Sequence, residues 1–184
     1  WTPFVSMAYS DMRYNTGSHI DSDGWNATLG IARRYEDKAG VLLVGPFVEY
    51  GHGDYDSYID GGGHAEGSAD DVGGGIFAQK TLKSGWYYDG SVRAGRVSAD
   101  YSSNDLLVGT MRVHEDYDYS TSYYGFHVGA GKVHDLSEKS RLDTYLRYLY
   151  SHQRGFGAEL GTGEHYDFDS VESNKIRVGT RYIH

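Results

Sequence analysis

Residues 40–53, GVLLVGPFVEYGHG, constrain the fold of this chain more than any other stretch. Successive residues of a β-strand point to opposite faces of a sheet, so this stretch presents two different surfaces. One face is wholly apolar or aromatic and consists of Leu42, Val44, Pro46, Val48 and Tyr50. The other face has a single charge, Glu49, beside the small residues Gly45 and Gly51. A soluble sheet places several charges on its watery face, whereas a membrane-spanning strand has an apolar outer face and a mixed inner one. The pattern therefore predicts a transmembrane β-strand.

The composition agrees with a chain built from such strands. Tyrosine (18 residues) and glycine (26) are abundant, proline is almost absent (2) and cysteine is missing. Chains of this kind suit many strands with aromatic girdles. No apolar run is long enough for a spanning helix. The net charge of −9 argues against a nucleic-acid partner, which would require clusters of Lys and Arg. At 184 residues, we expect a single β-barrel domain over residues 1–184.

Seven further segments alternate as strands do. Together with residues 40–53, they give eight expected strands: residues 2–13, 24–34, 40–53, 71–80, 86–99, 124–133, 141–152 and 172–182. Short turns follow the second, fourth and sixth strands, and long polar loops follow the first, third, fifth and seventh. No helical segment separates the strands, so the sequence predicts an all-β, antiparallel up-and-down meander that forms a transmembrane barrel. Both termini then lie on the side of the short turns, the periplasmic side.

The inner series of these strands provides the candidate lumen residues. They are Glu49, Asp71, Asp89, Arg93, His127, Arg147, Lys175 and Arg177. We expect Glu49, Arg93, Arg147 and Arg177 to form a charge network across the lumen, because a small barrel fills its interior with side chains. A hydrated pore wall without specific ion pairs is the alternative.

Glycines and aromatic residues divide between the two faces. The expected lumen glycines are Gly45, Gly73, Gly75, Gly95, Gly125, Gly129, Gly131 and Gly179. They either leave room for a threaded chain or relieve crowding in a narrow barrel. The expected outer girdle consists of Trp25, Tyr50, Tyr88, Tyr148 and Tyr150.

Nine histidines raise the question of a metal or catalytic site. Two acidic groups have spacings that would suit calcium: His52, Asp54 and Asp56, and His114, Glu115, Asp116 and Asp118. Neither has a fixed ligand pattern, so solvated acidic loops are expected, without a metal or cofactor. Ser151 and His152 are adjacent in a strand, point to opposite faces and cannot pair. His127 with a serine from a neighbouring strand stays open as a hydrolase arrangement, although we predict no catalytic residue.

The strand sequences resemble the β-domain of autotransporters, the translocators of type V secretion in Gram-negative bacteria. The matching pieces, in the family's order, are RYNTGSHIDSDGWNATLGIA, VGPFVEYGHGDYDSY, DDVGGGIFAQK, WYYDGSVRAGRV, YYGFHVGAGKV, LDTYLRYLY and FDSVESNKIRVGTR. The resemblance implies an outer-membrane barrel, not an enzyme, that anchors in the bilayer and exports an N-terminal passenger polypeptide. The bilayer (or detergent), the passenger and the outer-membrane assembly machinery are the implied partners.

The resemblance also implies strands beyond this chain. Family members have about twelve strands and end on an aromatic residue, whereas this sequence ends at Arg181-Tyr182-Ile183-His184. We therefore expect a shortened piece that lacks the passenger and the last family strands. An eight-stranded sheet either closes first strand to eighth, which we favour, or forms a homodimer through its open edges.

Two other functions are compatible with the sequence. One is a small outer-membrane barrel that binds a ligand or partner through its acidic loops. The other is an outer-membrane lipid hydrolase or acyltransferase, in which mutation of His127 or His152 would abolish turnover. A soluble lipocalin-like barrel, with its apolar face inward, is disfavoured by the outward Trp and Tyr side chains.

Overall fold

The computed structural model describes residues 1–15, 19–59, 63–108, 111–137, 139–159 and 165–183. Most residues in this part of the chain lie in strands. The strands are β1 (Thr2–Asn15), β2 (His19–Glu36), β3 (Gly40–Ile59), β4 (Gly63–Leu82), β5 (Trp86–Val108), β6 (Met111–Asp135), β7 (Arg141–Gln153), β8 (Phe156–Glu159), β9 (His165–Phe168) and β10 (Val171–Ile183). The described residues contain no helix that is long and apolar enough to cross a membrane.

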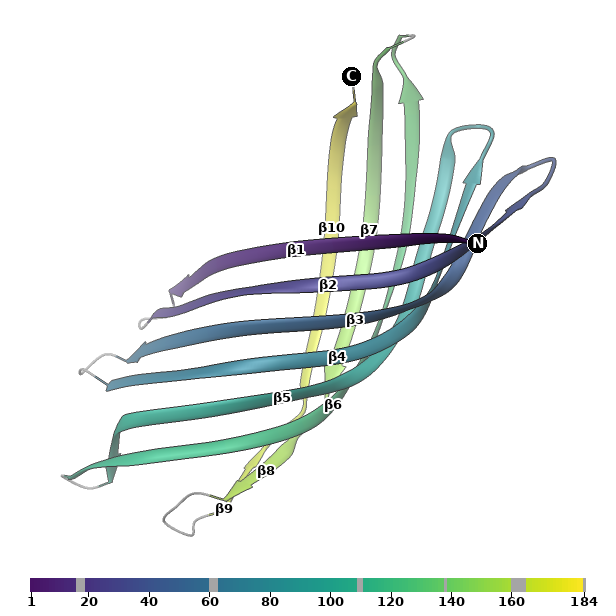
Figure 1. The fold of residues 1–184 in the computed structure, drawn as a ribbon. Coiled ribbons are helices and arrows are strands. Elements are labelled where there is room, and N and C mark those ends of the chain that lie inside the picture. Colours follow the sequence, from purple (N-terminus) through teal and green to yellow (C-terminus); the bar gives the residue numbers. More distant parts are fainter. Residues whose placement is uncertain (16–18, 60–62, 109–110, 138, 160–164, 184) are drawn as a thin grey trace.

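Eight of the strands form one antiparallel sheet in the order β1-β2-β3-β4-β5-β6-β7-β10. Each strand pairs with the next, and the sheet curls so that β1 and β10 come to lie on opposite sides of a concave space (Figure 1). The predicted all-β antiparallel meander is thus confirmed. Closure of the first strand on the eighth is wrong for this structure, because no ladder joins β1 to β10 in the described residues. The sheet is an open half-barrel with two free edges.

In the described residues, three of the segments that were expected to be long loops continue the strands instead. The segment 54–70 was expected to be a loop, but β3 and β4 stay paired from Asp54↔Ser68 to Ile59↔Gly63. β5 and β6 likewise stay paired beyond Ala99, with a register shift between Ser103 and Leu106, and β1 and β2 pair as far as Asn15↔His19. Acidic and glycine residues are typical of loops, yet antiparallel pairing continues because main-chain hydrogen bonds do not depend on side-chain polarity.

The connection between β7 and β10 also contains structure that was expected to be a loop. β8 and β9 form a separate two-stranded hairpin there. Its aromatic rings stack on the inner face of β6. The ring centroids of Phe156 and Tyr119 are 3.6 Å apart, and those of Phe168 and Tyr117 are 6.0 Å apart. The hairpin thereby covers part of the sheet at the end opposite the short turns (Figure 1).

The short turns at the other end of the sheet are as predicted. Gly85 has a φ of +85°, a left-handed conformation that glycine adopts without steric cost, and its amide donates to the carbonyl of Leu82. In the turn before β3, the Asp37 carboxylate accepts from the amides of Ala39 and Gly40 and pairs with Lys80 at 2.6 Å. Both chain ends lie on the side of these turns (Figure 1).

The sheet buries few apolar side chains and exposes many. Only Phe47, Ala65, Tyr87 and Ala99 are buried hydrophobic residues in the described part of the chain. Large apolar residues on the outer face are far more open, with Val48 59%, Ile76 57% and Val178 75% exposed. A contiguous apolar surface of this extent does not persist in water, so it is the surface that meets lipid.

Candidate functional site: the inner wall of the sheet

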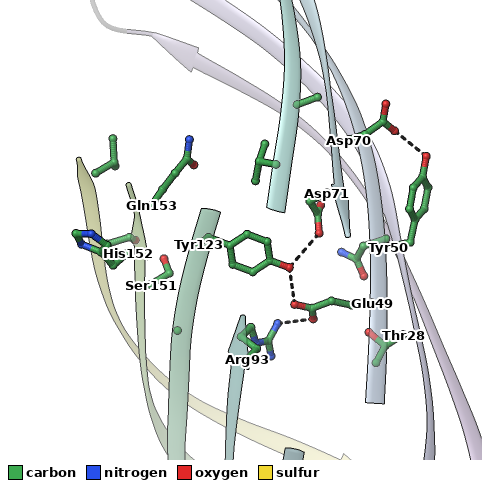
Figure 2. Close-up of a pocket in the computed structure, with 16 residues that line it drawn as sticks. Thr28, Glu49, Tyr50, Asp70, Asp71, Arg93, Tyr123, Ser151, His152 and Gln153 are labelled. Atoms are coloured by element: carbon green, nitrogen blue, oxygen red, sulfur yellow. Dashed lines mark hydrogen bonds and ion pairs between the residues drawn. The ribbon is translucent and has the colours of Figure 1, made fainter. Parts of the chain in front are cut away.

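The concave face of the curled sheet, called the inner wall here, brings together side chains from distant strands. Tyr123 on β6 reaches Glu49 on β3, although β4 and β5 lie between them in the sheet (Figure 2). Such a contact is possible only across the concave side. Alternate residues of every strand share this wall, because the ladders place Glu49 opposite Gly73, Gly95 opposite Tyr123 and Gly125 opposite Ser151.

Glu49 is the centre of the first polar cluster on the wall. Its carboxylate accepts from Arg93 Nη1 at 3.0 Å and from the Tyr123 hydroxyl at 2.9 Å (Figure 2). The Glu49 side chain is only 10% exposed, so these two donors replace the water that it loses. Tyr123 also lies 3.5 Å from Asp71 Oδ2, but its single proton serves the nearer Glu49. The inner wall thus places two carboxylates, Glu49 and Asp71, beside the Tyr123 hydroxyl, and Arg93 pairs with Glu49.

A second cluster is centred on Asp89 of β5. Its carboxylate faces His127 Nε2 at 2.8 Å and Arg147 Nε at 3.3 Å. The other ring nitrogen of His127, Nδ1, lies 2.7 Å from the Ser91 hydroxyl. One chain of polar contacts therefore joins β5, β6 and β7.

A third cluster lies nearer the short turns. The Asp143 side chain is 3% exposed and accepts from the Tyr87 hydroxyl at 2.9 Å and from Arg181 Nη2 at 3.0 Å. Sequence reasoning did not single out any of these three residues, nor Ser91 or Tyr123. The signal was present, because each occupies an inner position of its strand, but the partner across the ladders depends on a register that one sequence does not give.

The predicted four-residue network divides in the structure. Glu49 and Arg93 pair with each other, whereas Arg147 turns to Asp89. Arg177 lies opposite Arg147 in the β7–β10 ladder, and Lys175 lies opposite Leu149. Neither Arg177 nor Lys175 makes an ion pair among the described contacts. Both lie on β10, a sheet edge, where no neighbouring strand supplies an acidic partner on one side.

The inner glycines lie beneath large inner-wall side chains. A Cβ built at Gly95 would come within 2.7 Å of the Tyr123 ring, and one at Gly75 within 2.7 Å of the Phe47 ring. At Gly129 it would meet Asp89 Oδ1 at 2.7 Å and Arg147 Cγ at 2.8 Å. The same relation joins Gly73 to Tyr123, Gly131 to Tyr87 and Gly179 to Tyr145. A Cβ at Gly45, Gly75, Gly95 or Gly125 would also meet the backbone of the next strand. The glycines therefore provide space for neighbouring side chains to lie flat on the wall.

The expected girdle residues lie on the outer face. The rings of Trp25 and Tyr50 are 5.3 Å apart, and the Tyr150 ring is 5.5 Å from Phe126. Tyr148 donates to Asn174. Tyr88 pairs in register with Lys80, near the short turns, so aromatic side chains occur towards both ends of the apolar band.

Beyond Tyr50, the outer face becomes acidic and rich in histidine. His52 Nδ1 lies 2.9 Å from Asp70 Oδ1, and His52 Nε2 lies 3.6 Å from Asp54. Hydrogen bonding to Asp70 raises the pKa of His52, and the bonds from Tyr50 and then His52 lower the pKa of Asp70. His114 pairs with Asp116 at 3.2 Å, and the Glu115 side chain lies outside the described residues. In the described part of the chain, no three His, Asp or Glu side chains converge as metal ligands do.

Ser151 and His152 point apart, as expected for neighbours in a strand. Ser151 faces the inner wall, while the His152 ring lies 4.9 Å from the outer ring of Tyr124 and 3.4 Å from Glu172. The other open arrangement, His127 with a serine of the adjacent strand, is present: Ser91 is its direct ladder partner.

The comparisons with known proteins place this geometry in a family. The family model described as the autotransporter beta-domain matches residues 1–183. The crystal structure of the beta domain of the Bordetella autotransporter BrkA has a similar fold, with a TM-score of 0.82 at 20% identity over 98% of this chain and 69% of that one. The curated proteins contain no match. Since the family model spans nearly the whole chain, the protein belongs to the autotransporter β-domain family, the outer-membrane translocators of type V secretion in Gram-negative bacteria.

Proposed function

We propose that residues 1–184 form one translocator domain, which anchors in the outer membrane and passes an N-terminal passenger polypeptide to the cell exterior. The observation that supports this most strongly is the inversion of polarity across the sheet. Val48 and Ile76 are exposed on the outer face, whereas Glu49, Arg93 and Asp89 line the inner wall. An apolar exterior fits lipid, and a charged concave wall fits a hydrated path for an unfolded chain. Transport of this kind requires no enzymatic step.

The orientation follows from the two unlike ends of the sheet. Short turns and both chain ends occupy one side, and the extended acidic hairpins occupy the other. Outer-membrane barrels have short periplasmic turns and longer extracellular segments. We infer that the acidic strand tips are extracellular, and that insertion from the periplasm uses the outer-membrane assembly machinery.

The free edges of β1 and β10 need partners in a bilayer. Unpaired amide and carbonyl groups cost several kcal/mol each in hydrocarbon. We infer that further strands of the same barrel complete the ladder in the longer parent protein, and that an isolated chain of residues 1–184 pairs its edges with a second copy. The mass of the detergent-solubilised chain tests the second inference: a two-chain mass supports it, and a single-chain mass with heat-modifiable migration contradicts it.

Export is tested in the full-length parent carrying an epitope in its passenger. We expect an antibody to detect the epitope on intact Gram-negative cells. As a matched control, Val48→Arg in the barrel places a charge in the lipid-facing band, and we expect it to abolish surface detection through failed insertion. A heat-modifiable, membrane-inserted wild-type barrel whose passenger stays in the periplasm would overturn the proposal.

A further inference from the structure

The second cluster of the inner wall has the connectivity of a nucleophile, a base and an acid. Ser91 and Asp89 lie two residues apart on β5, so both side chains point to the inner wall. His127 on β6 is the direct ladder partner of Ser91. Its two ring nitrogens face the Ser91 hydroxyl at 2.7 Å and Asp89 Oδ2 at 2.8 Å. The ladder register alone thus brings three side chains of hydrolytic chemistry together.

The hydrogen bonds allow one direction of donation in neutral His127. Asp89 as a carboxylate can only accept, so His127 carries its proton on Nε2. Nδ1 is then the acceptor, and the Ser91 hydroxyl donates to it. A serine that donates to an imidazole held by a carboxylate is the arrangement that activates a serine nucleophile. In the usual triad, the serine donates to Nε2 and the carboxylate accepts from Nδ1–H. In this cluster the two ring nitrogens exchange these roles.

The surrounding wall holds this arrangement in place. Arg147 of β7 lies 3.3 Å from the carboxylate oxygen that faces His127, and the Asp89 side chain is 11% exposed. Gly129, opposite both Asp89 and Arg147 in register, leaves the space that these side chains occupy. The His127 side chain is 21% exposed, so the base remains open to water in the concave space.

Ser91 also borders a cavity that suits an acyl chain. The cavity has a volume of about 460 Å³, and much of its lining is apolar: Phe4, Ala32, Leu43, Phe47 and Phe77. Thr2, Thr28, Arg34 and Glu49 complete the lining together with Ser91 and Arg93. Ser91 and Arg93 lie at its boundary, two residues apart on β5.

We propose that Ser91 is a nucleophile that hydrolyses carboxylic esters with an apolar acyl chain. Ser91 Oγ attacks the ester carbonyl carbon while its proton passes to His127 Nδ1. The C–O bond to the alcohol breaks, and the leaving oxygen takes the proton from His127. Water then attacks the carbonyl carbon of the acyl-serine and gives a proton to His127. The bond from this carbon to Ser91 Oγ breaks, Ser91 Oγ takes that proton from His127, and the carboxylic acid leaves.

The first test uses the whole chain, folded in detergent micelles. A fluorophosphonate probe should label it once, at Ser91, as located by peptide mass spectrometry, and p-nitrophenyl butyrate should be turned over. Ser91→Ala and His127→Gln should each lower turnover about 100-fold or more. Ser98→Ala, on the outer face of the same strand, is the matched control and should retain it. Heat-modifiable gel migration shows which variants are folded.

The second test separates activation from a structural role. The chain has no cysteine, so Ser91→Cys creates a unique thiol. If His127 acts as a base, iodoacetamide should alkylate this thiol at neutral pH at least 10-fold faster than it alkylates the folded double variant Ser91→Cys/His127→Gln. Equal alkylation rates, or a folded wild-type chain that the fluorophosphonate leaves unlabelled, would overturn the proposal.

Discussion

Single side chains on the inner wall show how this sheet keeps charges away from bulk water. Glu49 has two donors, Arg93 and Tyr123, which come from different strands. Hydrogen bonds to charged groups are worth more than neutral ones, and removal of a donor leaves the acceptor uncompensated. The carboxylate therefore depends on the curl of the sheet, because Tyr123 reaches it only across the concave side.

Tyr123→Phe removes one donor while it keeps the ring that covers Gly95. We expect the free energy of unfolding to fall by about 1–3 kcal/mol, because the Glu49 carboxylate loses a hydrogen bond at a poorly exposed position. Urea unfolding in lipid vesicles, followed by tryptophan fluorescence, measures this change. Tyr88→Phe is the matched control, since the Tyr88 hydroxyl has no hydrogen bond among the described contacts and faces outward. An equal loss in the two variants would contradict the role assigned to Tyr123.

The His52–Asp70 pair lies beyond the girdle residue Tyr50, towards the acidic strand tips, and it predicts that the stability of the fold depends on pH. Hydrogen bonding to Asp70 raises the pKa of His52 in the folded state. The stabilisation of the folded state by His52 is therefore fully present below the unfolded pKa of about 6.5, and it is lost as the pH rises through the folded pKa. The pKa of Asp70 is lowered, so its contribution is lost only as the pH falls through the folded value. The difference in unfolding free energy between wild type and His52→Asn should thus be largest between about pH 4 and 6.5 and shrink towards pH 8. A difference that is constant over this range would contradict the pairing.

At the scale of the strand, large and small residues alternate across neighbouring ladders. Tyr123 lies over Gly95, Phe47 lies over Gly75, and Asp89 with Arg147 lies over Gly129. Protein interiors tolerate little added volume, because close-packed neighbours must shift to accept even one methyl group. The inner wall is therefore shaped by pairs of residues on adjacent strands.

Gly129→Ala tests this packing. The added Cβ would lie within 2.8 Å of both Asp89 Oδ1 and Arg147 Cγ, so we expect a loss of about 1–3 kcal/mol in the free energy of unfolding. Gly90→Ala, on the outer face of β5, is the control, because its Cβ would meet only the His127 carbonyl oxygen at 3.2 Å and Val128 Cγ1 at 3.9 Å, an ordinary van der Waals distance. Unfolding of both variants in the same vesicles gives the comparison. If Gly129→Ala is as stable as Gly90→Ala, the inner wall is not closely packed at Gly129 and the prediction is wrong.

At the scale of the molecule, the alternation of residues predicted the membrane-facing sheet but not its edges or its contacts. Leu42, Val44 and Val48 alternate with Gly45 and Glu49. This period of two predicted the strand, the face that each side chain occupies and the membrane-barrel fold class. The tips beyond Gly53 were expected to be loops, because Asp54 and Asp56 resemble loop residues, although their backbones pair. The partners of Tyr123, Ser91 and Asp143 depend on ladder register and on curl, and neither property is encoded in the local pattern.

The inverted polarity of the whole sheet gives the last prediction, which concerns Val48. This residue is 59% exposed at the middle of the outer face, while its neighbour Glu49 is mostly buried on the inner one. A lipid-facing arginine near the bilayer centre costs about 2–4 kcal/mol in a membrane barrel, so Val48→Arg should destabilise the folded state by that amount. Val48→Leu should be close to neutral, because it keeps an apolar side chain against lipid. Urea titration in vesicles of phosphatidylcholine resolves this difference. If Val48→Arg is instead tolerated as well as Val48→Leu, the outer face does not meet hydrocarbon, and the opposite assignment of faces, with the apolar side covered by protein, follows.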